Sequence, residues 1–128
     1  MEENYQLALL YFVHLLIGAD GIADRTEVEA LDRIKQKENI SDRTFADFSN
    51  AISSMTERET YQIAIDHLSK CNEGEKLKVF GTLYRLSEVD GRVHTKEIKL
   101  LIYSIEDAGI EFNDVVDYAK ANPSLLTK

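Results

Sequence analysis

The chain matches itself at a constant offset of 70 residues, and this internal repeat constrains its fold more than any other feature. Ala19–Val28 aligns with Val89–Ile98, and Asp, Gly and Glu coincide. From Leu7 to Ile40, seven of 34 positions are identical to their counterparts, where ordinary composition gives roughly two or three by chance. Because two copies are too few for a solenoid, the repeat predicts a closed pseudo-twofold bundle.

The predicted fold class is all-α, with about seven helices in one domain spanning residues 1–128. Only one proline and six glycines interrupt the chain, and no segment alternates apolar and polar residues with the period of a strand. The repeat units cover about residues 3–54 and 73–122. A fourth helix lies between them. The first and fifth helices are the most apolar, so we expect them at the centre.

Short capping patterns predict where most helices begin and end. Ser41 is expected to cap the third helix, Thr56 and Glu59 to form a capping box before the fourth, and Asn72 with Glu75 to act likewise for the fifth. The first helix is predicted over residues 3–17, and the second carries Val28, Leu31 and Ile34. The sixth helix is predicted to follow Asp90-Gly91 and to stop at Gly109. The last helix is predicted over residues 113–121, and Pro123 ends it.

Charge and cysteine content exclude several classes of function. The net charge of −8 opposes binding to nucleic acid and to anionic lipid. A single cysteine, Cys71, excludes an internal disulfide and a Cys-rich zinc site. The first six residues contain no base, so no secretory signal is expected. The apolar run Leu7–Ala19 is shorter than the roughly 20 residues of a transmembrane helix. We therefore expect a cytoplasmic protein without a transmembrane segment; peripheral membrane association stays open.

The repeated element, Asp-Gly-x5-Glu, has a purely structural interpretation. An Asp-Gly step forms a tight turn, and Asp24-x-x-Glu27 has the spacing of a capping box at the start of the second helix. In the second copy His94 is a poorer cap, but Thr95 is available one residue later. Glu97 then lies in the first helical turn, where the helix dipole favours negative charge.

The same element also has the donors of a divalent-metal site. Hard cations such as Ca²⁺ and Mg²⁺ bind carboxylate, carbonyl and water oxygens. The candidate ligands are Asp20, Asp24 and Glu27 in the first copy, and Asp90, His94 and Glu97 in the second. An EF-hand is rejected, because its first ligand position would be occupied by Leu16 or Leu86 and its third by Gly18 or Glu88. Both the capping and the metal interpretations stay open at this point.

The segments GADGIADRTEVEAL and SEVDGRVHTKEIKLL resemble the acidic signatures of the TerB-like domain family (tellurite-resistance protein B and relatives). The resemblance implies an all-helical domain with an internal duplication, and metal binding at Asp20, Glu27, Asp90 and Glu97. It also implies a link to stress and tellurite-resistance systems, to membrane-associated complexes, or to certain membrane-anchored J-domain co-chaperones. This chain departs from the family in having His94 at the cap position, and we expect no appended J-domain or membrane anchor.

No residue pattern indicates an enzyme. The chain has no phosphate-binding loop and no dinucleotide fingerprint, and nothing selects one acid–base pair among its 23 carboxylates. His14 is predicted to be a structural histidine of the core or helix edge. His67 has Asp66 beside it in the sequence, but adjacent helical residues point in different directions. Cys71 is predicted to be a buried or partly buried structural thiol. The alternative to a metal-binding module is therefore a helical scaffold for protein partners of unknown identity. Such a scaffold would bind its partner through an exposed apolar patch. The aromatic residues available for this patch are Tyr5, Tyr11, Tyr61, Tyr84 and Tyr103.

Overall fold

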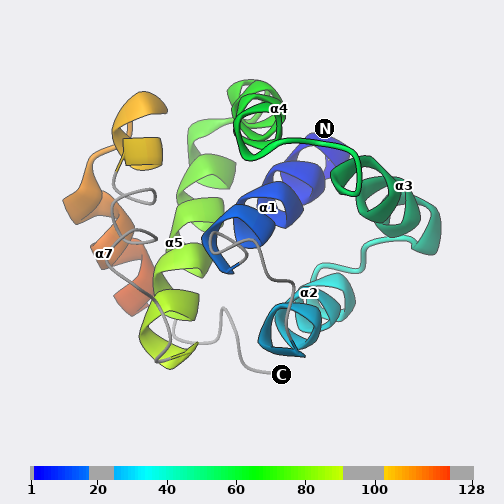
Figure 1. Ribbon diagram of the computed structural model, residues 1–128. Helices are drawn as coiled ribbons and strands as arrows, with labels where there is room; N and C mark the ends of the chain where they lie inside the picture. The colour runs from blue at the N-terminus through cyan, green and yellow to red at the C-terminus, as the bar shows by residue number, and fades with distance from the viewer. Residues whose placement is uncertain (1, 18–24, 91–102, 122–128) are drawn as a thin grey trace.

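The computed structural model describes residues 2–17, 25–90 and 103–121, and within these ranges the chain is helical with no strand (Figure 1). The helices are α1 (Glu2–Ile17), α2 (Arg25–Lys37), α3 (Asp42–Ile52), α4 (Glu57–Ser69), α5 (Glu73–Asp90) and α7 (Phe112–Ala121). Residues 103–107 are also helical. The all-α class is therefore confirmed. Within the described ranges no helix has the length and apolar character needed to cross a membrane.

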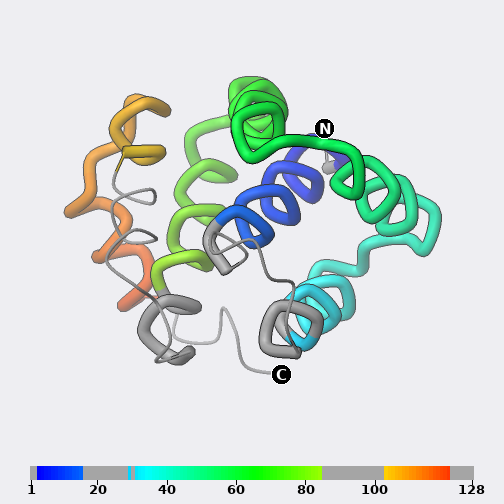
Figure 2. Tube along the Cα trace, in the orientation of Figure 1, coloured from blue at the N-terminus to red at the C-terminus, as the bar shows by residue number. Residues whose placement is uncertain are grey.

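Helix α1 lies at the centre, because apolar residues cover its whole circumference. Among residues 3–15, whose side chains the structure describes, eight are buried, namely Tyr5, Ala8, Leu9, Leu10, Tyr11, Phe12, Val13 and Leu15. It packs most extensively on α4 and also contacts α2, α3 and α5. Helix α5 contacts α1 on one side and α7 on another. Figure 2 shows α7 beside α5, with α2 and α3 on the opposite side of α1.

The predicted helix starts are confirmed by their capping bonds. Ser41 Oγ accepts from the Thr44 N–H at 3.1 Å. Thr56 and Glu59 form a reciprocal capping box, with distances of 2.9 and 3.1 Å. Asn72 and Glu75 make the equivalent pair of bonds before α5, at 3.0 and 2.8 Å. Each cap joins residues three apart, so its geometry is set within one helical turn.

The predicted first and last helices each begin one residue earlier in the structure, α1 at Glu2 and α7 at Phe112. Helix α5 extends to Asp90. The turn predicted at Asp90-Gly91 continues into residues that lie outside the described part of the chain.

Two helix C-termini close with the same hydrogen bonds. After α2, Ile40 N donates to Lys35 O at 2.9 Å and Asn39 N to Gln36 O at 3.3 Å. After the helical residues 103–107, Ile110 N donates to Ile105 O at 3.1 Å and Gly109 N to Glu106 O at 3.0 Å. Asn39 (φ 58°) and Gly109 (φ 76°) adopt the left-handed conformation that this Schellman cap requires. The predicted helix stop at Gly109 is confirmed.

The left-handed cap at Gly109 gives a testable prediction. A Cβ added there would meet no atom within 4 Å, so the cost of Gly109→Ala comes from the backbone alone. We expect a loss of about 1–2 kcal/mol in the free energy of unfolding, measured by urea denaturation. Gly74→Ala, in the first turn of α5, is the matched control and should be neutral or stabilising by up to about 1 kcal/mol. Equal effects of the two substitutions would contradict the assigned cap.

Candidate functional site

The six predicted metal ligands lie where the structure describes little. Asp20, Asp24, His94 and Glu97 are outside the described residues, as are the side chains of Glu27 and Asp90. The backbone of Glu27 is the third residue of α2, which begins at Arg25, and this is the position a capping box with Asp24 requires. Among the described residues, no group of three or more His, Cys, Asp or Glu side chains is placed to hold a metal ion.

The helices that lead into the two acidic motifs are neighbours. α1 and α5 contact each other, and in Figure 1 both run from the upper part of the molecule towards its lower part. Aligned positions along them are buried together: Leu9 with Val79, Leu10 with Phe80, and Val13 with Leu83 are each at most 1 % exposed. The two repeat units differ in how their last helices pack. Helix α7 packs on α5 more extensively than α3, its counterpart, packs on α1.

His14, His67 and Cys71, which lie in the described part of the chain, occupy structural environments. His14 is half-buried and meets the Phe48 ring edge-on, with centroids 6.3 Å apart. His67 stacks on Tyr11 at 6.0 Å, and its Nδ1 lies 2.9 Å from Asn4 Oδ1. Cys71 is buried, and its thiol lies 3.5 Å from the His67 carbonyl oxygen. Burial raises the pKa of the Cys71 thiol, which disfavours the reactive thiolate.

The environment of His67 predicts a pH-dependent stability. Burial, followed by the nearby Lys70 ammonium, lowers its pKa from the usual 6.5. The unfolded chain therefore binds this proton more readily than the folded chain, and the stability contributed by neutral His67 is lost as pH falls from about 6.5 through the lowered pKa. We expect His67→Gln to flatten the decline of unfolding free energy in that window, as followed by urea denaturation at several pH values. An unchanged slope would contradict the prediction.

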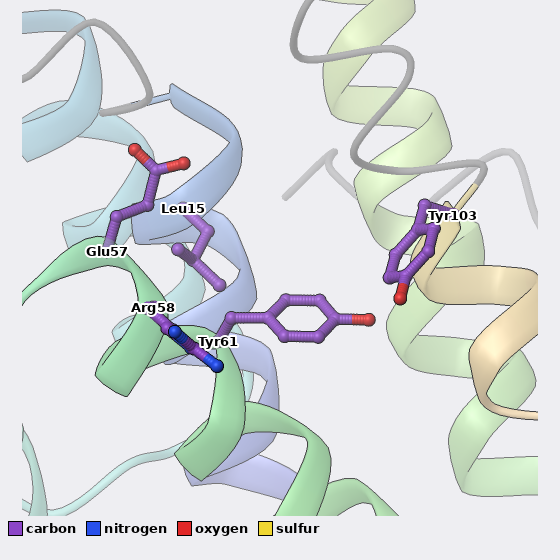
Figure 3. Close-up of a pocket in the computed structure, with 5 residues that line it drawn as sticks. All are labelled: Leu15, Glu57, Arg58, Tyr61 and Tyr103. Carbon is purple, nitrogen blue, oxygen red and sulfur yellow. The ribbon is translucent and has the colours of Figure 1, made fainter.

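An aromatic pocket of about 340 Å³ opens beside α4 (Figure 3). The Tyr61 ring extends from α4 towards Tyr103, which lies on the opposite wall, while Leu15 of α1 lies beside the base of Tyr61. The two tyrosine rings are 6.0 Å apart, and Tyr61 Oη donates to Asp107 Oδ2 at 3.1 Å. Burial is the main cause that raises the pKa of Tyr61 to about 12. The Tyr61 hydroxyl therefore stays protonated at neutral pH. Glu57 and Arg58 also line the pocket.

A second pocket, of about 370 Å³, is polar and was not predicted from the sequence. It lies where α1, the end of α2 and α5 meet, and it is lined by Tyr5, Gln6, Glu38, Asn39, Glu75 and Lys78. Its residues come from α1, from α5 and from the turn after α2. The hydrogen bonds that join them link positions 32 and 40 residues apart. No local spacing marks such a cluster in the sequence.

Comparison with models of protein families, with curated protein sequences and with solved structures finds no match to this chain. The TerB-like resemblance therefore rests on the two acidic segments and on the helical pattern around them.

Proposed function

We propose that this chain is a non-enzymatic, TerB-like helical module that binds divalent cations through its two Asp-Gly-x5-Glu motifs. One observation carries the proposal: the features around the two motifs recur at the offset of the sequence repeat. The left-handed caps fall at residues 39 and 109, and the helices after them begin at residues 42 and 112. In the sequence, each motif begins at or shortly after the last residue of α1 or α5 and precedes one of these caps.

The duplication favours binding over capping as the reason for the carboxylates. A cap needs only one good acceptor, and Ser, Thr, Asp or Asn supplies it equally well. In the second copy the cap position carries His94, yet Asp90 and Glu97 are retained. Hard oxygen donors of this kind suit Ca²⁺ or Mg²⁺ with water completing the coordination. By the TerB-like resemblance, we infer a role in a stress-related system.

Calorimetric titration tests this proposal. We expect Ca²⁺ or Mg²⁺ to give saturable heat with the wild type, and Asp20→Asn/Asp90→Asn to abolish it. Titrations with Mn²⁺ and Zn²⁺ then show which divalent cation the sites prefer. Asp47→Asn/Asp117→Asn is the matched control, because it makes the same change in charge at two exposed positions of α3 and α7 that are also 70 residues apart. Heat that survives in the Asp20/Asp90 variant, or no heat with any ion in the wild type, would refute the proposal.

A second variant separates metal binding from capping. Glu27→Gln can still close a capping box, so on the capping interpretation it changes the unfolding free energy by only a few tenths of a kcal/mol and leaves everything else unchanged. On the metal interpretation it also weakens cation binding, because an amide is a poorer ligand for a hard cation than a carboxylate. Wild-type affinity in Glu27→Gln would exclude this residue as a ligand.

The alternative function, a scaffold for protein partners, is favoured by one specific observation. Tyr103 is 60 % exposed and Phe112 is 40 % exposed. Tyr103 lines the pocket in Figure 3, and Phe112 packs edge-on against Tyr84 with centroids 6.0 Å apart. Exposed aromatic residues of this kind are enriched where proteins meet. This function predicts that Tyr103→Ser abolishes capture of the partner without affecting cation binding.

A further inference from the structure

We draw no further inference here: the strongest candidate, the aromatic pocket that Tyr61 of α4 and Tyr103 line beside Leu15 of α1, carries nothing because nothing in the part of the chain that the structure describes shows what covers it.

Discussion

Phe80→Ala is expected to lower the free energy of unfolding by about 3–5 kcal/mol, the range for removing a fully buried phenylalanine from a core. Phe80 is 0 % exposed. Its ring lies 5.7 Å from that of Phe12, so the pair joins α5 to the central helix α1. Small domains have about 5–15 kcal/mol of stability in total. Urea denaturation followed by circular dichroism should therefore show a large fall in the midpoint.

Two further variants make this result specific to the α1–α5 interface. Phe80→Leu retains most of the apolar volume and should cost clearly less than Phe80→Ala. Tyr103→Ala removes a ring that is 60 % exposed, and we expect a change within about 0.5 kcal/mol. If Phe80→Ala cost no more than Tyr103→Ala, Phe80 could not be a core residue that joins α5 to α1.

Lys78→Met is expected to lower the free energy of unfolding by about 1–3 kcal/mol. Methionine retains an apolar stem of similar length over Tyr5 but removes the ammonium that faces Glu38. The Glu38 side chain, with 10 % exposure, is then left as a poorly solvated carboxylate without its ion-pair partner. The effect is smaller than for a fully buried pair, because Lys78 itself is 38 % exposed.

A double-mutant cycle checks that the loss arises from this pair. Glu38→Gln removes the charge that Lys78 neutralises, so Lys78→Met should cost much less in the Glu38→Gln background than in the wild type. Lys120→Met, at an exposed position of α7, is the control for the loss of one lysine charge and should be nearly neutral. Additive effects of the Glu38 and Lys78 substitutions would show that the ion pair contributes nothing.

The helix boundaries were predictable because their signals are local. Ser41, Thr56 with Glu59, and Asn72 with Glu75 each satisfy free N–H groups within one helical turn, and Gly109 relieves the strain of a left-handed residue. The central position of α1 followed from its apolar character on every side. The turn predicted at Asp90-Gly91 stays a prediction, because α5 extends to Asp90 and Gly91 lies outside the described residues.

The polar pocket was not predictable because its chemistry depends on tertiary packing. Glu38 follows the last turn of an amphipathic helix, where an acidic residue is ordinarily exposed. Only the approach of α5 and α1 buries it and brings Lys78 and Gln6 into contact with it. Tyr5 was likewise expected to belong to the edge of the core, but its side chain is buried. The ligands of the proposed cation sites, in turn, were selected by the repeat rather than by any single motif.

The number of cations bound per chain tests the central claim most directly. Equilibrium dialysis against Ca²⁺ and Mg²⁺, followed by metal analysis, should give two ions for the wild type. Asp20→Asn and Asp90→Asn alone should each retain one ion, and the double variant none, because each copy of the motif forms its own site. A wild type that binds neither cation, or single variants that both retain two ions, would contradict a duplicated metal-binding module.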